Sequence, residues 1–203
     1  MSAVLELTEK SVTNGNAFHI AKPYRFNVKT YDLMIERGIL NENDNVELLN
    51  GEIIDKMSKG KKHAYYNDLI SDYLKETFGK DGIVRNQNPI LLDQFSEPEP
   101  DIVLAKLPRE KYLSQHPTPE DILLIIEVSD STLYFDRNEK GLAYSQAGIQ
   151  QYLLVNVENN TIEDYRKPTE DGYQSKQTYE IGEKFSLVAF PEIEINVEDF
   201  LPN

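Results

Sequence analysis

The sequence predicts a mixed α/β domain with a central β-sheet flanked by helices, an N-terminal β-hairpin and a C-terminal antiparallel meander. Two apolar runs, 102–105 and 122–126, are short and rich in β-branched residues, which indicates strands buried on both faces. Between residues 59 and 78 the apolar side chains recur at helical spacing. From residue 161 onward charged and apolar residues alternate, which is typical of strands with one solvated face.

The length favours one domain. The chain has 203 residues and 39% hydrophobic content, enough for a sizeable core in a globular protein. Residues 1–24 are polar and lack a clear period, so we expect an N-terminal arm there and a single domain over 25–203.

The first third of the chain predicts two helices and a hairpin. Asn27 is a suitable cap for a helix over 28–37. Asn50-Gly51 tolerates the positive φ angles of a tight turn, so residues 46–57 predict a β-hairpin. The helical spacing of 59–78 ends at Gly79, which favours a helix with His63 in its first turn.

The middle of the chain predicts strands around an acidic, proline-rich turn. We expect strands over 83–85 and 89–92, the turn E-P-E-P over 97–100, and a strand over 102–105. A polar connector with a short helix over 109–113 follows, and the 122–126 run is the next strand.

A second helical segment and the meander complete the prediction. Asp136 and Glu139 form a capping-box pattern, so a helix is expected to begin at Asp136, with Lys140 and Tyr144 on one face and Gly148 at the end. The expected strands that follow are 151–157, 161–166, 173–179 and 184–188.

Composition limits the classes of function. The formal net charge is −14, with 35 acidic residues against 21 Lys and Arg, which disfavours tight non-specific binding to nucleic acid. The basic clusters 59–62 and 109–111 are candidates for a local phosphate-binding patch, although short basic runs are usually solvated surface. The chain has no cysteine, no run of 18 apolar residues and no signal-peptide pattern at its start, so we expect a cytoplasmic protein without a membrane span.

Two acids stand where a buried strand would carry hydrophobic residues. Asp101 precedes the first apolar run and Glu127 continues the second. A buried carboxylate costs several kcal/mol, in order of magnitude, unless a cation or hydrogen-bond donors face it. With Lys140 nearby, these acids form a minimum set for metal-assisted phosphodiester hydrolysis, in which carboxylates hold Mg²⁺ and an ammonium orients the activated water. Structural alternatives are a strand-end cap for Asp101 and a buried salt bridge for Glu127 with Lys140 or His63.

The order of these motifs resembles the PD-(D/E)XK restriction endonuclease-like superfamily. More closely, the chain is similar to the putative restriction endonuclease family known as a domain of unknown function. The matching stretches are V-E-L-L-N-G-E-I-I, the helix start at His63, P-D-I-V-L, I-E-V-S-D-S-T and D-R-N-E-K-G-L-A-Y-S-Q-A-G-I-Q-Q-Y-L-L-V-N, between about residues 28 and 157.

This resemblance implies a restriction endonuclease-like core with metal ligands at Asp101 and Glu127. It also implies auxiliary roles for Glu47, which could otherwise be an exposed residue of an edge strand, and for His63, which could otherwise be a surface or capping residue. The simplest superfamily pattern has a lysine two positions after the second acid, where this chain has Ser129, so the catalytic lysine is expected to be Lys140 on the next helix.

The function implied by the resemblance is a DNA endonuclease that uses Mg²⁺ or Mn²⁺, and analogy adds a homodimer. Two other classes stay open: a catalytically inactive nuclease-fold protein that binds other proteins through its acidic surface, and a metal-dependent hydrolase of a small phosphorylated or carboxylated substrate. The sequence contains no phosphate-binding G-x-x-x-x-G-K-[ST], no dinucleotide-binding G-x-G-x-x-G after a strand and no G-x-S-x-G, which argues against nucleotide-binding enzymes and serine hydrolases.

Overall fold

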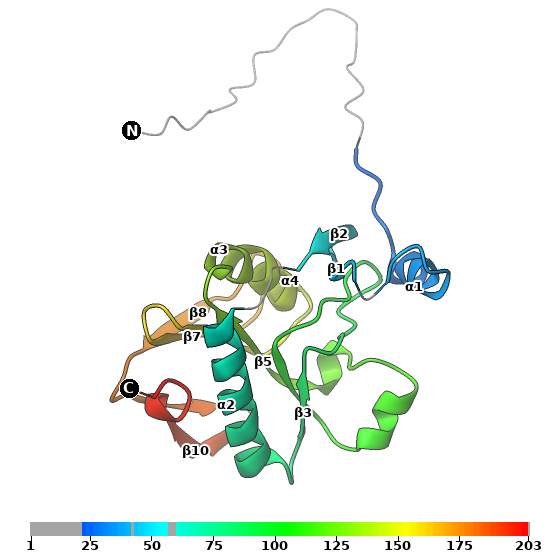
Figure 1. The fold of residues 1–203 in the computed structure, drawn as a ribbon. Helices are drawn as coiled ribbons and strands as arrows, with labels where there is room; N and C mark the ends of the chain where they lie inside the picture. The colour runs from blue at the N-terminus through cyan, green and yellow to red at the C-terminus, as the bar shows by residue number, and fades with distance from the viewer. Residues whose placement is uncertain (1–21, 42, 57–59, 203) are drawn as a thin grey trace, which may run out of the picture.

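The computed structural model describes residues 22–41, 43–56 and 60–202 (Figure 1). Its helices are α1 (Val28–Glu36), α2 (Lys61–Phe78), α3 (Leu133–Phe135) and α4 (Gly141–Gln146), with shorter turns η1 (Arg109–Leu113), η2 (Pro119–Asp121), the π-helical η3 (Asp136–Lys140) and η4 (Val197–Asp199). Its strands are β1 (Val46–Leu49), β2 (Glu52–Asp55), β3 (Ile83–Asn86), β4 (Ile102–Ala105), β5 (Ile122–Ser129), β6 (Gln151–Asn156), β7 (Thr161–Arg166), β8 (Ser175–Tyr179), β9 (Lys184–Leu187) and β10 (Phe190–Asn196). The predicted arm lies outside the described residues up to position 21. Within the described part of the chain, no helix is long and apolar enough to cross a membrane.

The centre of the fold is a mixed six-stranded sheet in the order β3-β4-β5-β6-β7-β8. Strands β5 and β6 are parallel, and every other neighbouring pair is antiparallel. Parallel neighbours need a crossover connection, and here the continuous segment α3–η3–α4 supplies it. The predicted mixed sheet flanked by helices is confirmed.

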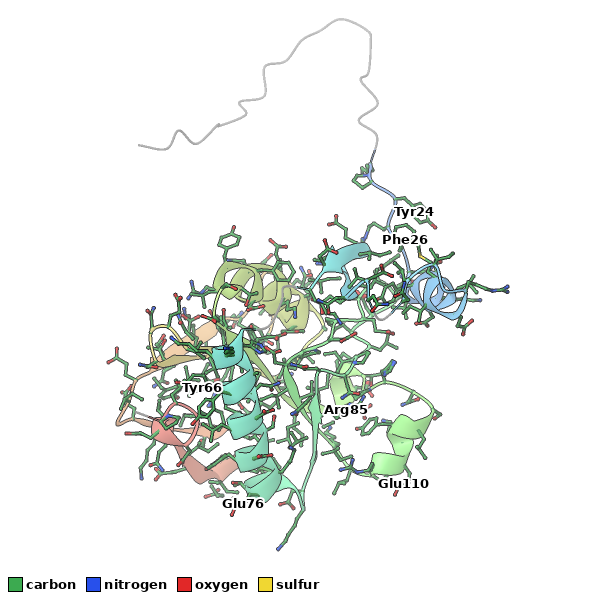
Figure 2. The ribbon with its side chains drawn as sticks, viewed as in Figure 1. Tyr24, Phe26, Tyr66, Glu76, Arg85 and Glu110 are labelled. Carbon is green, nitrogen blue, oxygen red and sulfur yellow. The ribbon has the colours of Figure 1, made fainter. Side chains whose placement is uncertain are left out.

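Helices cover both faces of this sheet because the buried strands are apolar on both sides. Side chains of α2, including Ile70, Leu74 and Phe78, pack with Ile102 and Leu104 of β4 on one face. Tyr66, which Figure 2 labels on α2, packs against the same cluster. On the other face a second core is formed by residues of β4, β5 and β6 with α4: Val103, Ala105, Ile125, Leu154, Ala143 and Tyr144.

The N-terminal segments form as the sequence predicts. The side chain of Asn27 accepts a hydrogen bond from the backbone N–H of Thr30 at 2.8 Å and caps α1. Strands β1 and β2 form the hairpin, in which Asn50 and Gly51 have φ angles of +52° and +80°. The predicted helix start at Lys59 lies outside the described residues, and the described helix ends at Phe78 as expected.

Two predictions for local structure are wrong. Residues 89–92 do not form a strand: Ile90 N–H donates to the Pro98 carbonyl and Leu91 N–H to the Pro117 carbonyl, so two different loops satisfy this backbone. Asp136 does not begin a helix, because Phe135 already has helical φ and ψ of −67° and −46° and the chain continues through the π-helical turn.

The C-terminal strands are present, but their pairing differs from a simple meander. Strands β6, β7 and β8 are consecutive and antiparallel at one end of the sheet. Strand β9 leaves this sheet and pairs with β10 in a separate two-stranded sheet. Ile195 of β10 and Phe200 are fully buried in the core that contains α2, so the C-terminal tail is part of that core.

Candidate active site

Asp101 and Glu127 lie next to each other on the same face of the sheet. Ile102 of β4 is opposite Ile126 of β5, so one more step of the antiparallel register brings Asp101 opposite Glu127. The N–H of Asp101 donates to Oε2 of Glu127 at 3.2 Å, and the N–H of Val128 donates to Oδ2 of Asp101 at 2.9 Å. Both side chains are buried, with 7% and 2% of the residue exposed. The two acids therefore share one small region.

Glu127 is held by two side chains from the crossover segment. The Nζ atom of Lys140 lies 3.1 Å from Oε1 of Glu127, and the hydroxyl of Tyr144 donates to the same oxygen at 2.6 Å. This agrees with the prediction that Lys140 and Tyr144 share one helical face. Burial raises the pKa of Glu127, and the neighbouring ammonium of Lys140 opposes that rise.

Lys140 is also close to a second glutamate. Its Nζ atom lies 3.3 Å from Oε1 of Glu47, whose Oε2 accepts a hydrogen bond from the N–H of Glu99 at 2.9 Å. Burial alone would lower the pKa of Lys140, but the carboxylates of Glu127 and Glu47 raise it, and the net shift is upward. Glu47 is 2% exposed rather than on the solvated face of an edge strand, because the segment before β4 lies against β1 through the bond from Glu97 N–H to the Leu48 carbonyl.

His63 reaches the site from the first turn of α2. Its Nε2 atom lies 2.9 Å from Oδ2 of Asp101, so it is neither a surface nor a capping residue. Burial would raise the pKa of Asp101, but the hydrogen bonds from His63 and from the Val128 N–H lower it, and Lys140 adds a smaller favourable charge. A carboxylate at Asp101 is therefore available to a cation at neutral pH.

A cavity of about 220 Å³ lies where α2, the hairpin, β5 and the crossover segment meet, and it is lined by Glu47, His63, Asp101, Glu127 and Lys140. Figure 1 shows the α3–α4 segment above the upper end of α2, with the hairpin strands β1 and β2 next to α4 in this view. Among the residues that the structure describes, six acids line this cavity: Glu47, Asp55, Glu99, Asp101, Glu127 and Asp130. Its basic lining residues within the described chain are Lys56, His63 and Lys140. The cavity is thus a strongly acidic environment, suited to a cation.

The carboxylate oxygens of the site are suitable ligands for a hard divalent cation, but the described side chains are not arranged as a metal site. Carboxylate oxygens are the ligands that Mg²⁺ and Mn²⁺ prefer. Among the described residues, however, no three His, Asp or Glu side chains are grouped closely enough to hold an ion. The ammonium of Lys140 occupies the space between Glu47 and Glu127. Ion binding at Asp101 and Glu127 would require this ammonium to shift its contacts.

The structure brings the five predicted residues together, and sequence reasoning missed part of the surrounding cavity. Lys56, Asp55, Glu99 and Asp130 also line it. Glu99 had a signal, because it lies two positions before Asp101 in the same proline-rich segment and alternate residues of an extended chain share a face. Nothing in the sequence distinguished Asp55 or Asp130 from the other acids of the chain.

Comparisons with known proteins show the family to which this chain belongs and a solved structure with a similar fold. Residues 28–198 match the model of a family, Uma2, described as "Putative restriction endonuclease", so the chain belongs to this family and to the restriction endonuclease-like superfamily. Its fold is similar to that in a crystal structure titled as a putative nuclease belonging to DUF820 from Anabaena variabilis. That match has a TM-score of 0.63 and 18% identity and covers 81% of this chain and 94% of the other. No curated protein matches the chain significantly.

Proposed function

We propose that this chain is a divalent-metal-dependent endonuclease that hydrolyses phosphodiester bonds of DNA. The observation that carries the proposal is the convergence of Asp101, Glu127 and Lys140 in one acidic cavity, with Glu47 and His63 beside them. These residues come from separate elements of the chain, and the core alone does not require them to meet. Membership of the family supports the nuclease class.

The residues have distinct roles in this proposal. Asp101 and Glu127 would hold Mg²⁺ or Mn²⁺, and the bound ion would supply a water of lowered pKa and polarise the phosphate. Lys140 would orient that water or offset the charge that develops on the phosphate. Glu47 positions Lys140 through the contact at 3.3 Å. His63 positions the Asp101 carboxylate through the contact at 2.9 Å.

A plasmid-nicking assay with Mg²⁺ or Mn²⁺ tests the proposal. Asp101→Asn and Glu127→Gln keep the side-chain size and remove a charged ligand. We expect each to lower cleavage by at least about 100-fold, since loss even of the groups that orient metal ligands costs ~10–100-fold. Asp72→Asn, an exposed acid paired with Lys75 on α2, is the matched control and should cleave like wild type. Cleavage that persists unchanged in both site variants would contradict the proposal.

A second function is supported by the hydrogen bonding of Glu127. Both of its oxygens already have partners, Oε1 with Lys140 and Tyr144 and Oε2 with the Asp101 N–H. A buried acid satisfied in this way is compatible with a catalytically inactive member that acts as an acidic protein-interaction module. A folded wild-type chain that cleaves no DNA with either metal would favour this second function.

The proposal extends to assembly. Two active sites are needed to cut both strands in one encounter, so we propose a homodimer, as for many enzymes of this type. Light scattering at several protein concentrations would measure the mass directly, and a monomer at all concentrations would refute this part alone. The expected cytoplasmic location stays a prediction.

A further inference from the structure

Two lysines line the candidate active-site cavity among the described residues, and they differ in how firmly they are held. Lys140 is buried between Glu127 and Glu47, at 3.1 and 3.3 Å. Moving its ammonium towards a phosphate would leave both glutamates without their counter-charge, which is costly for buried acids. Lys140 is therefore held beside Glu127 and Glu47, where the proposed function uses it, and is not free to bind a separate backbone phosphate.

Lys56, directly after β2, is held much less firmly at its charged end. Its Nζ atom contacts Oε2 of Glu99 at 2.7 Å, and the two side chains are 19% and 26% exposed. The pair is partly buried but reaches solvent, which screens it more than the contacts of Lys140, so the partner of this ammonium can be exchanged at a lower cost. The backbone of Lys56 is fixed, because its N–H donates to the Asn45 carbonyl and its own carbonyl accepts from Nδ2 of Asn45, both at 2.8 Å.

The Lys56–Glu99 pair also has open space on two sides. Both residues line the candidate active-site cavity, and both line a neighbouring hollow of about 170 Å³ whose wall also includes Tyr31 and Ile35. The pair therefore forms part of the wall between two cavities. A ligand in either cavity can reach the ammonium without unpacking the core.

An anionic substrate needs such a group. Six acids line the cavity, whereas its basic lining residues in the described chain are Lys56, His63 and Lys140. Bringing a phosphodiester among those carboxylates is unfavourable unless a cation accompanies it. A metal ion would offset part of this repulsion. A lysine whose ammonium can exchange its carboxylate partner for the phosphate would offset more of the repulsion.

We infer that Lys56 binds a backbone phosphate of the DNA substrate and that Glu99 holds its ammonium until the substrate displaces it. The inference rests on the proposed function and adds a substrate-binding residue with a built-in competitor. Glu99 then opposes DNA binding, so removing its charge has the opposite effect from removing Lys56. The effect of Glu99 must also depend on the presence of Lys56.

The test is DNA binding measured in an uncleaving Asp101→Asn background, with a fluorescent duplex over a range of salt concentrations. Lys56→Met should weaken binding and reduce the slope of log affinity against log salt by about 1, as expected for loss of one phosphate contact. Lys56→Arg should restore the slope, because it keeps the charge. Lys75→Met, which removes a lysine from an exposed pair on α2, is the matched control and should leave both quantities unchanged.

Glu99→Gln supplies the second arm. It should strengthen binding several-fold in the presence of Lys56 and much less in a Lys56→Met chain, where only the repulsion between Glu99 and the phosphate is removed. Asp72→Asn removes the same charge from a distant exposed pair and controls for the change in net charge. A gain from Glu99→Gln that is equally large without Lys56 would mean that Glu99 acts only by repelling the phosphate, and it would overturn the inference.

Cleavage kinetics separate this inference from the proposed function. If wild type cleaves DNA, Lys56→Met should raise KM several-fold and change kcat less than twofold. If wild type cleaves DNA and Lys56→Met has the same KM and salt slope as wild type, the role of Lys56 is overturned and the proposed function is not. Failure of wild type to bind or cleave DNA overturns both.

Discussion

Glu97 gives a prediction for the pH dependence of stability. It lies at the start of the segment that leads to Glu99 and Asp101, and it is only 7% exposed. Burial, followed by the charges of Asp32 and Glu99, raises the pKa of Glu97 from 4.5 to about 7. The folded state therefore holds this proton more tightly than the unfolded state.

The direction of the pH effect on stability follows from the linkage between proton binding at Glu97 and folding. Because the folded-state pKa is the higher one, the stabilising contribution is fully present below pH 4.5 and is lost as the pH rises to about 7. A shift of this size would correspond to about 3 kcal/mol at ~1.4 kcal/mol per pH unit. Since the neighbouring Asp32 is exposed and solvent screens its charge, we expect about 1–2 kcal/mol.

The perturbation is Glu97→Gln, which keeps the shape and cannot ionise. At pH 8 its Tm should exceed that of wild type by about 2–8 °C, at ~2–4 °C per kcal/mol for a chain of this size. At pH 4.5 the two chains should melt together. Glu76→Gln is the control, because Glu76 is an exposed residue of α2 (Figure 2) and should show no such difference. Equal Tm values for Glu97→Gln and wild type at both pH values would refute the reasoning.

Three further predictions concern the site itself. Tyr144→Phe removes the 2.6 Å bond to Glu127, and urea unfolding should show a loss of about 1.5–3 kcal/mol, the value of a hydrogen bond to a charged group. Lys140→Met leaves Glu127 and Glu47 without their cation, so we expect a loss of about 3–5 kcal/mol in the same experiment, and an unchanged unfolding midpoint would contradict the pairing. Mn²⁺ at about 100 times its Kd should stabilise wild type by ~2.7 kcal/mol in a thermal melt and should stabilise Asp101→Asn much less.

The sequence predicted elements well where local pattern and tertiary environment agree. The runs within β4 and β5 are apolar at nearly every position, and both faces of these strands are buried. Residues 89–92 show the limit of this reasoning. Ile90 is fully buried, as its apolar character indicates, but its backbone N–H donates to a loop carbonyl. The apolar pattern of this segment therefore indicated burial correctly but did not indicate a strand.

The site was predicted less completely because several of its contacts connect distant parts of the chain. Glu47 looked like an exposed strand residue, since the segment that covers it is Glu97–Glu99, some fifty positions later. The capping-box pattern at Asp136 favoured a helix start, but the packing of the crossover continues the helix through that point. That continuation places Lys140 and Tyr144 over Glu127.

The position of Lys140 connects stability with the proposed chemistry. Three carboxylates, from Asp101, Glu127 and Glu47, lie in a cavity where each would be costly if left unpaired, and one ammonium contacts two of them. The lysine two positions after Glu127 in the simplest superfamily pattern would extend from the same strand, whereas Ser129 of this chain is fully buried. A lysine on the crossover segment instead contacts Glu127 and Glu47 together. Its ammonium therefore links the hairpin, which carries Glu47, and the central sheet, which carries Glu127, to the crossover segment. Any cation that binds Asp101 and Glu127 must share these oxygens with that ammonium, and for this reason we expect metal affinity and the Lys140 contacts to change together in variants of Glu47.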